Sequence, residues 1–328
     1  MASEHKHLYR VYSDKGDCLA SVSGRLRHAA YGREAYPAVG DWVVITLSDD
    51  GHHDHAVIHA ILPRRSKFSR KVAGKVLDEQ IVAANVDTVF IVNALNHDFN
   101  LRRIERYLTV TWDSGATPVI VLTKADLCPD VDAHVDSAQS VAPGVDVVAI
   151  SCITGQGLNQ LDRYLLPGRT VALLGSSGAG KSTIINRLVG AEVQRTQAVR
   201  TDDDRGRHTT TARELIAIPG KGMIIDTPGM RELQLWAGDD DTVSDAFADI
   251  SQLAVACKFS DCSHGSEPGC AVRHALREGT LDPDRFESFL KLQRERAYIS
   301  RKENIHELLA ERDRWKKINM QFRKANKR

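Results

Sequence analysis

The stretch VALLGSSGAGKST, residues 171–183, decides the fold class. It begins as an apolar run typical of a buried parallel strand and continues into Gly175-x4-Gly180-Lys181-Ser182, the spacing of a phosphate-binding loop. Such glycines let the backbone turn tightly and point its N–H groups at phosphates, and the helix expected from Lys181 adds its N-terminal dipole. The expected phosphate-binding residues are Gly175, Ser176, Ser177, Gly178, Ala179, Gly180, Lys181, Ser182 and Thr183.

Strands and helices alternate around this loop. Apolar, strand-like runs lie at 86–95, 117–126, 145–151, 170–175 and 222–229, and helix-like patterns separate them at 100–112 and 157–165. Apolar runs of this kind, joined by helical crossovers, form the parallel sheet of an α/β protein. We therefore expect an α/β nucleotide-binding domain over residues 66–236.

Two different regions flank this domain. Short, partly alternating runs separated by Gly, Asp and Pro turns occupy 8–13, 19–27, 41–47 and 55–62. They predict a small β-barrel over residues 1–65, either an OB-fold or an SH3-like barrel, which would give a similar pattern. Beyond residue 236 a Cys/His segment precedes helical stretches, and we expect a third domain at 237–328 that ends in a basic helix.

Four further motifs distinguish among the enzymes that use such a loop. DTPG (226–229) follows an apolar strand, where Asp226 would hold Mg²⁺ through water and the Gly229 N–H would sense the γ-phosphate. The threonine cluster 209–211 precedes the next strand-like run, and Thr210 is the first choice to complete the Mg²⁺ shell, with Thr209 and Thr211 as alternatives. Ser182 would ligate the same ion.

The sequence TKAD, which comprises Thr123, Lys124, Ala125 and Asp126, resembles a guanine-reading Asn-Lys-x-Asp motif. The Asp126 carboxylate would accept hydrogen bonds from guanine N1 and N2, a pair of donors that adenine lacks. Thr123 replaces the usual Asn, which ties the base loop to the phosphate loop, so an ATP-using enzyme remains an alternative. SCITGQG (151–157) resembles the last guanine-contacting motif, with backbone near Ser151 and Cys152 meeting the base oxygen.

The order of these motifs is unusual. Both base-reading motifs precede the phosphate loop, whereas in ordinary GTPases they follow it. A circular permutation that joins the old termini would preserve every site, because the termini of a compact domain often lie close together. The sequence therefore predicts a circularly permuted P-loop GTPase domain.

The segment CKFSDCSHGSEPGC carries a complete tetrahedral ligand set of three thiolates and one imidazole, namely Cys257, Cys262, His264 and Cys270. No ligand position is left open, so we expect one structural Zn²⁺ per chain. A second histidine-rich stretch, GHHDHAVIH (51–59), is interpreted as a polar turn that leads into a strand.

The composition is that of a globular protein, with 42% hydrophobic and 27% charged residues among 328 and a net charge of +1. Residues 291–328 hold 13 Lys/Arg and 5 Asp/Glu, and residues 63–75 form a second basic cluster, so we expect an anionic partner. The start of the chain has no signal-peptide pattern and no run is apolar enough to span a membrane, which predicts a cytoplasmic protein.

Together, TKAD ahead of GSSGAGKS, then GRHTTT, DTPG and CxxxxCxHxxxxxC, preceded by a small barrel, resemble the bacterial ribosome small-subunit-dependent GTPase A family. The resemblance covers nearly the whole chain. It implies a GTPase that binds GTP and GDP, acts late in assembly of the 30S subunit and is stimulated by it. It also implies an OB-fold that binds 16S rRNA and a zinc domain that helps docking. Nothing in the sequence demands a dimer, so we expect a monomer.

The residue that positions the attacking water is less evident. Met230 stands after DTPG, where many GTPases carry a water-orienting Gln, and a thioether cannot do this. His208 in GRHTTT is the nearest alternative, and the resemblance points to it as well. If turnover were incidental, the protein would instead be an RNA-binding module stabilised by nucleotide.

Overall fold

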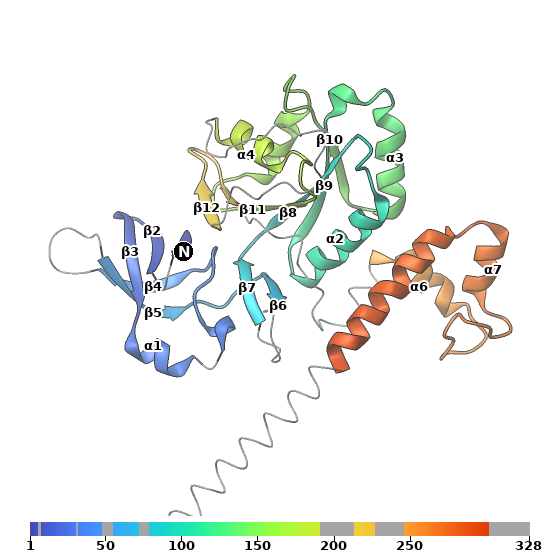
Figure 1. Cartoon of the computed structure of the whole chain (residues 1–328), viewed down its shortest axis with the longest axis horizontal. Coiled ribbons are helices and arrows are strands. Elements are labelled where there is room, and N and C mark those ends of the chain that lie inside the picture. Colours follow the sequence, from blue (N-terminus) through green and yellow to red (C-terminus); the bar gives the residue numbers. More distant parts are fainter. Residues whose placement is uncertain are drawn as a thin grey trace, which may run out of the picture. The chain divides into compact units, whose positions relative to one another are not determined.

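A computed structural model gives the structure of the chain (Figure 1). It describes residues 1–5, 8–30, 32–47, 55–71, 79–190, 213–226 and 246–301. The chain divides into two compact units, one of residues 1–70 and 79–234 and the other of residues 71–78 and 235–328. Among the described residues, no helix has both the length and the apolar character that crossing a bilayer requires.

The first unit is organised around one long sheet with the strand order β10-β9-β8-β11-β13-β12-β1-β2-β3-β5-β4. Its α/β half consists of β8 (Thr88–Ala94), β9 (Thr117–Thr123), β10 (Asp146–Ala149), β11 (Thr170–Gly175), β12 (Glu214–Ala217) and β13 (Met223–Asp226). Every neighbouring pair from β10 to β13 is parallel, and β12 pairs with β13 antiparallel. The predicted α/β domain with a largely parallel sheet is confirmed.

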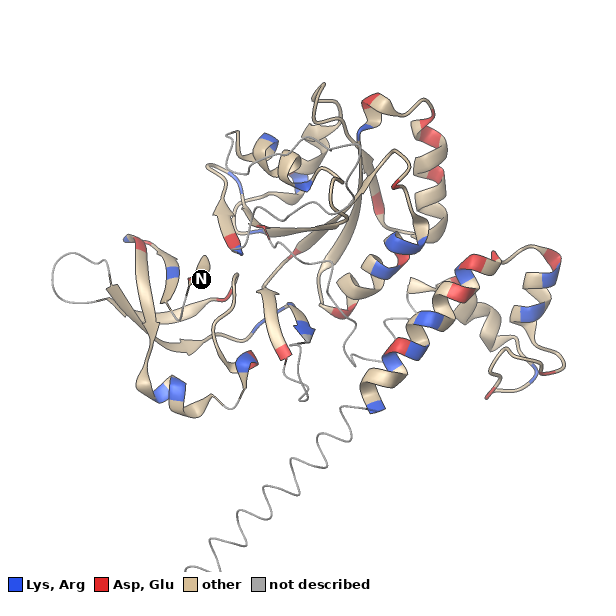
Figure 2. Ribbon diagram, viewed as in Figure 1, with Lys and Arg blue, Asp and Glu red and all other residues tan. Residues whose placement is uncertain are grey.

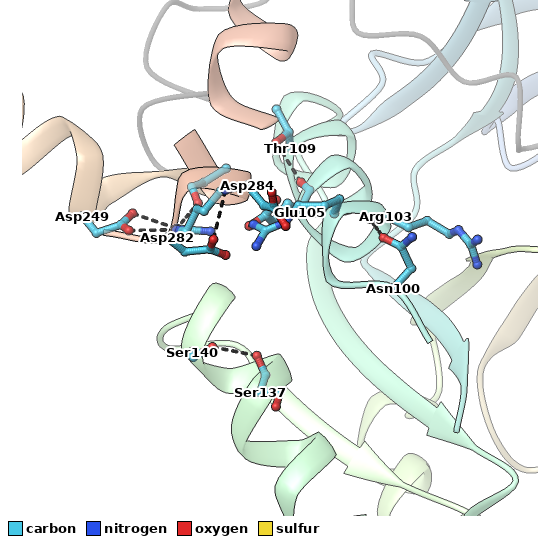
Figure 3. A network of polar contacts seen from close by, with 12 residues as sticks. Asn100, Arg103, Glu105, Thr109, Ser137, Ser140, Asp249, Asp282 and Asp284 are labelled. Carbon is cyan, nitrogen blue, oxygen red and sulfur yellow. Dashed lines mark hydrogen bonds and ion pairs between the residues drawn. The ribbon is translucent and has the colours of Figure 1, made fainter. Parts of the chain in front are cut away.

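Helices α2 (Leu101–Asp113), α3 (Val131–Val141) and α4 (Lys181–Val189) connect or follow these strands. Asn100 caps α2 because its Oδ1 accepts the Arg103 N–H at 2.9 Å (Figure 3). Where a crossover helix is expected at 157–165, the structure has only a 3₁₀ helix, η3 (Leu158–Tyr164). It is seven residues long and begins after Gly157 at φ 75°, so the apolar pattern there supports a shorter, tighter turn than an α-helix.

The core of this half lies against the middle of the sheet. β8 and β11 are buried along their whole length, in agreement with their apolar sequences. Fully buried side chains include Phe90, Val121, Ile184 and Ile224, each of which contributes roughly 1.5–3 kcal/mol of hydrophobic stabilisation. This buried core fixes the positions of the carboxyl ends of the parallel strands. The loops that carry the motifs begin at those ends.

The other half of the sheet contains β1 (Ser3–His5), β2 (Leu8–Ser13), β3 (Gly16–Val22), β4 (Val43–Leu47) and β5 (His55–Ile61), with α1 (Gly24–Ala29) and the 3₁₀ helix η1 (Arg33–Ala35) between β3 and β4. The order β1-β2-β3-β5-β4, with β3 and β5 parallel, is compatible with a five-stranded Greek-key barrel. The expectation of a strand through 19–27 is wrong at its end. The chain leaves β3 at Val22, and the Ser23 Oγ accepts the Leu26 N–H at 3.2 Å to start α1.

The two halves are joined edge to edge. β1 pairs antiparallel with β12 at Ser3 and Glu214, and the Tyr12 hydroxyl donates to the Leu215 carbonyl at 3.1 Å. A separate two-stranded sheet pairs β6 (Lys67–Lys71), which lies in the basic cluster, with β7 (Glu79–Ala84), which follows that cluster; the sequence predicts no strand in either range. Gly40 lies next to β7 at φ +91°, where a Cβ would stand 2.0 Å from the Ala84 carbonyl oxygen. Only glycine fits this contact.

The second unit contains α6 (Ala248–Val255), α7 (Ala271–Glu278) and a helix over 283–301. Phe247 and Phe289 pack with ring centroids 5.5 Å apart. The Arg285 guanidinium lies 4.8 Å from the Phe247 ring and donates to both carboxylate oxygens of Asp249, at 2.7 and 2.8 Å (Figure 3). The helical character predicted for the chain after the Cys/His segment is confirmed over 283–301.

Candidate nucleotide site and metal centre

The phosphate loop has the predicted strand, turn and helix. β11 ends at Gly175 and α4 begins at Lys181, with Gly178 and Gly180 between them at φ 74° and 98°. A Cβ on Gly175 would lie 2.4 Å from the Val92 carbonyl oxygen of β8. The glycines are therefore needed both for the left-handed turn and for the close approach of a neighbouring strand.

Lys181 closes over its own loop. Its Nζ donates to the carbonyl oxygens of Gly175 and Ser176 at 2.8 and 2.6 Å. These bonds hold the ammonium group at the mouth of the loop, where it can meet an anion. Asp226, at the carboxyl end of β13, is close enough to interact with it: burial raises the pKa of Asp226 and the charge of Lys181 acts in the opposite direction. The structure thus brings these two predicted site residues together.

The Thr123 hydroxyl ties the predicted base loop to the phosphate loop. It is buried and donates to the Ala179 carbonyl at 2.7 Å, across 56 residues of sequence. A Cβ on Gly180 would be 3.6 Å from the Thr123 hydroxyl oxygen, so the two loops are in contact. The connection between the two loops that an Asn would provide at this position is made here by a threonine.

The remaining residues of the predicted base-reading motifs lie in the loops directly after β9 and β10. Lys124 adopts φ 61°, and the Ala125 N–H donates to the Ile150 carbonyl at 3.1 Å. The Ser151 Oγ accepts the Thr154 N–H at 3.1 Å, so the side chain of Ser151 is occupied within its own loop. Burial raises the pKa of the Cys152 thiol, which stays neutral. TKAD and SCITGQG therefore lie side by side, with the Asp126 side chain exposed.

Two groups of predicted residues lie outside the described ranges. They are the switch segment with His208, Thr209, Thr210 and Thr211, and the residues Gly229 and Met230 that follow Asp226. Most of the basic C-terminal segment, residues 302–328, is also outside them, as are residues 51–54 of the histidine-rich stretch. His55–Ile61 forms β5, as expected of the end of that stretch.

Sequence reasoning missed Asp98, which follows β8 and contacts the phosphate loop. The Ser176 hydroxyl donates to the Asp98 carboxylate, and the Arg103 guanidinium pairs with the same carboxylate at 2.8 Å. Desolvation acts to raise the pKa of Asp98, but the hydrogen bonds from Ser176 and Arg103 outweigh it and the pKa is lowered. The available signal was the polar run NHDFN directly after an apolar strand.

Replacing Thr123 by Val tests the tie between the loops. The two side chains are nearly equal in size, so the change removes the hydroxyl and leaves the Ala179 carbonyl without this donor. Because a lost buried hydrogen bond costs roughly 1–3 kcal/mol, we expect the Kd for GTP to rise about 5- to 150-fold. Titration with a fluorescent GTP analogue measures this. The Thr123→Ser control keeps the hydroxyl, and equal affinity of the two variants would contradict the role of the tie.

The metal-ligating residues of the second unit converge as predicted. The ligand atoms of Cys257, Cys262, His264 and Cys270 all lie within 4.8 Å of one another. The Sγ atoms of Cys257 and Cys270 are 3.8 Å apart, and they lie 3.7 and 3.5 Å from the His264 Nδ1. In a tetrahedral zinc site with Zn–S near 2.3 Å and Zn–N near 2.0–2.1 Å, two sulfur ligands lie about 3.8 Å apart, and a sulfur and a nitrogen ligand lie about 3.5 Å apart. The cluster can hold a metal ion, and its spacing fits zinc.

The backbone supports these ligands. Cys270 caps α7, since its Sγ accepts the Arg273 N–H at 3.4 Å. Desolvation acts to raise the pKa of Cys257, but the N–H groups of Ala271 and Val272 at the start of α7 outweigh it, and the pKa is lowered. His264 adopts φ 58°, a left-handed conformation that directs the chain between the second and third cysteines. The lowered pKa of Cys257 favours its thiolate, which is the form that binds a metal. At Cys262 the His264 N–H acts to lower the pKa, but desolvation and the thiol neighbours outweigh it and raise the pKa to about 11.

Comparisons with known proteins identify the family of the chain. The sequence model of the family described as RsgA GTPase matches residues 61–236. A protein of Opitutus terrae named Small ribosomal subunit biogenesis GTPase RsgA is 50% identical over 324 residues, 97% of this chain and 88% of that protein. One of Oceanobacillus iheyensis, named Small ribosomal subunit biogenesis GTPase RsgA 1, is 50% identical over 321 residues, 98% of this chain and 91% of the relative.

Two solved structures resemble this chain in fold. YjeQ from Thermotoga maritima has a TM-score of 0.65 at 25% identity over 90% of this chain and 96% of its own. YloQ, described as a circularly permuted GTPase, has a TM-score of 0.63 at 23% identity over 90% of this chain and 93% of its own. The permuted fold predicted from the motif order is confirmed. The chain belongs to the RsgA GTPase family.

Proposed function

We propose that this protein is a GTP hydrolase that acts in late maturation of the 30S ribosomal subunit, binds 16S rRNA and is stimulated by the subunit. The relatives that match almost the whole chain carry the name of a small-subunit biogenesis GTPase. The single observation that carries the enzymatic part is the Thr123–Ala179 hydrogen bond, because it places the base loop beside the phosphate loop. A guanine nucleotide could contact both.

The residues then have distinct roles. Asp126 accepts from guanine N1 and N2, and the Lys124 stem packs along the base, next to the backbone of Ser151 and Cys152. The N–H groups of 175–183 and the Lys181 ammonium bind the phosphates. Ser182 and Thr210 would hold Mg²⁺ directly and Asp226 through water, and the Gly229 N–H would sense the γ-phosphate. Mg²⁺ supplies charge neutralisation between the β- and γ-phosphates when bound.

The same assignment explains why a partner is needed. With Met230 in the usual place of a water-orienting residue, unaided turnover should be on the order of 10⁻⁴ s⁻¹, as for other switch GTPases. His208 lies in the proposed switch segment, and docking on the subunit would order it beside the attacking water. Activation by the 30S subunit is the consequence.

Replacing His208 by Ala is expected to abolish 30S-stimulated hydrolysis and leave the Kd for GTP within about twofold, because His208 acts on the water and not on the nucleotide. Phosphate release is measured with and without 30S subunits, and GTP affinity by titration. The matched control is His5→Ala, which removes an exposed histidine on β1. Full stimulation of the His208 variant would remove it from the mechanism.

The other assignments are part of the same proposal. The metal at the Cys₃His cluster is a structural Zn²⁺, and the barrel is an OB-fold that contacts rRNA together with the basic C-terminal helix. Among the aromatic side chains of this module, Trp42 is 58% and Tyr9 2% exposed, Tyr36 is half-buried, and Tyr31 lies outside the described residues. The Tyr12 hydroxyl donates to the Leu215 carbonyl. Trp42 and Tyr36 are therefore the available stacking platforms. The protein acts as a monomer in the cytoplasm, where ribosomal subunits mature.

A competition experiment tests nucleotide class separately. GTP is expected to displace a bound fluorescent guanine nucleotide at least 100-fold more effectively than ATP, because adenine leaves the Asp126 carboxylate without donors. Equal displacement by ATP would contradict the guanine assignment and favour an ATP-using enzyme. GDP serves as the positive control.

A further inference from the structure

The N-terminal barrel contains a hollow of about 590 Å³ that no part of the proposed mechanism uses. We call it the Tyr9 pocket. It is lined by residues of β2, of the segment around α1 and η1, and of β7. Figure 2 shows that α1 carries Lys/Arg residues. Its size is within the roughly 300–1,000 Å³ of small-molecule sites. Its polar lining residues are Glu4, Tyr9, Arg27, Arg33, Tyr36 and Gln80.

The Tyr9 hydroxyl is a polar group that points into this hollow. Its side chain is 2% exposed overall, but its hydroxyl oxygen is accessible, and it has no hydrogen bond to the residues that the structure describes. Burial raises the pKa of Tyr9 to about 12, with Glu4 and Tyr36 acting in the same direction and Arg27 opposing them. These three neighbours all line the hollow, so the hydroxyl faces it. Buried tyrosines usually find a partner for this group, and a ligand in the pocket would provide one.

The other lining groups define what that ligand must offer. Gln80 lines the pocket, and because its Oε1 accepts from the Arg70 Nε at 3.1 Å, its amide N–H groups are the donors that it can offer a ligand. Glu4 adds a carboxylate acceptor, and the half-buried Tyr36 adds an aromatic face. A planar heterocycle with donors and acceptors along its edge complements these three groups. Arg27 and Arg33 are exposed at the rim and complement an attached anion.

We propose that the Tyr9 pocket binds one ribonucleotide of an RNA strand. The base enters the hollow, stacks on Tyr36 and is read by Tyr9, Glu4 and Gln80, and the flanking phosphates contact Arg27 and Arg33. This inference rests on the proposed binding of rRNA and deepens it, because it adds readout of an extruded base to contacts with the phosphate backbone. The site is separate from the GTP site, which lies at the carboxyl ends of β9, β11 and β13.

The chain offers a matched pair for the test. Arg25 and Arg27 stand two residues apart on α1, and both are exposed, but only Arg27 lines the pocket. Tyr9→Phe removes only the unpartnered hydroxyl, so it should leave the thermal unfolding midpoint unchanged or raise it. Tyr36→Ala removes the stacking face, which is worth roughly 1–3 kcal/mol per base and converts to about 5- to 150-fold in Kd.

The full-length protein, with its GTP site saturated by GDP, is titrated with fluorescein-labelled octamers of A, C and U, and with AMP, CMP, GMP and UMP as competitors. We expect Tyr36→Ala and Arg27→Ala to weaken the preferred octamer about tenfold or more, and Arg25→Ala less than about twofold. Tyr9→Phe should reduce the preference among the octamers. The mononucleotides should compete at least 100-fold more weakly than RNA.

Two outcomes would overturn the proposal. If all pocket variants bind RNA like Arg25→Ala, the pocket does not receive RNA. If mononucleotides compete as well as octamers and lose this ability in Tyr36→Ala, the ligand is a free nucleotide. Stimulation of GTP hydrolysis by 30S subunits is measured on the unmodified protein. Because that assay does not depend on the pocket variants, either outcome against the pocket proposal can be distinguished from a result against the proposed function.

Discussion

Replacing Asp126 by Asn is expected to transfer nucleotide preference from guanine to xanthine. The carboxylate of Asp126 would accept two hydrogen bonds from guanine N1 and N2, and each hydrogen bond to a charged group contributes roughly 1.5–3 kcal/mol. The variant should therefore bind GTP at least about 100-fold more weakly. Xanthine has a carbonyl oxygen where guanine has its amino group, and the Asn amide can donate to it. Affinity for XTP should rise in parallel.

The measurement is displacement of a fluorescent guanine nucleotide by GTP, XTP and ATP. Asp130→Asn is a control with the same change of charge four residues away. The Asp130 Oδ1 accepts the Ala133 N–H to cap α3, and Asn caps a helix about as well, so this variant should behave as the unmodified protein. An Asp126→Asn variant that keeps its preference for GTP would show that TKAD does not read the base.

The second large effect is expected from Cys270→Ser. Serine is a preferred helix cap, so the start of α7 should persist while one thiolate ligand is lost. Structural zinc contributes an apparent 10–16 kcal/mol in small zinc domains, which is as large as the whole stability of a typical domain. We expect the zinc content to fall from about one per chain to near zero. The second unit should then become susceptible to protease.

The control is Cys128→Ser, a cysteine of the first unit outside the cluster. Zinc is measured by elemental analysis of the purified protein, and the second unit is followed by limited proteolysis. Because the two units are separately compact, GTP binding by the first unit should survive in Cys270→Ser. Unchanged zinc content and unchanged protease resistance would contradict a structural zinc at this cluster.

Several features of the fold could be predicted because their causes are local. The strands β8, β9 and β11 are mostly apolar, and glycines at fixed spacing mark the phosphate loop. The metal cluster could be predicted for the same reason, since its four ligands lie within 14 residues of sequence. Motif order was sufficient to predict the circular permutation, which the likeness to YloQ confirms.

Other features depend on distant partners and could not be predicted. β1 has only three residues, Ser-Glu-His, and forms a strand because it is held between β2 and β12, more than 200 residues away. The link from Thr123 to Ala179 joins two loops that are separate in sequence, so the sequence alone shows an atypical residue and not the bond that it makes. The role of Asp98 at Ser176 is of the same kind.

One measurement tests the central claim most directly. Phosphate release from GTP by the purified protein is followed alone, with 30S subunits and with 50S subunits, and the series is repeated with ATP. The proposed function predicts slow release alone, on the order of 10⁻⁴ s⁻¹, and strong stimulation by 30S subunits for GTP only. Equal, slow release of phosphate in every mixture would contradict it and would favour an RNA-binding module that nucleotide merely stabilises.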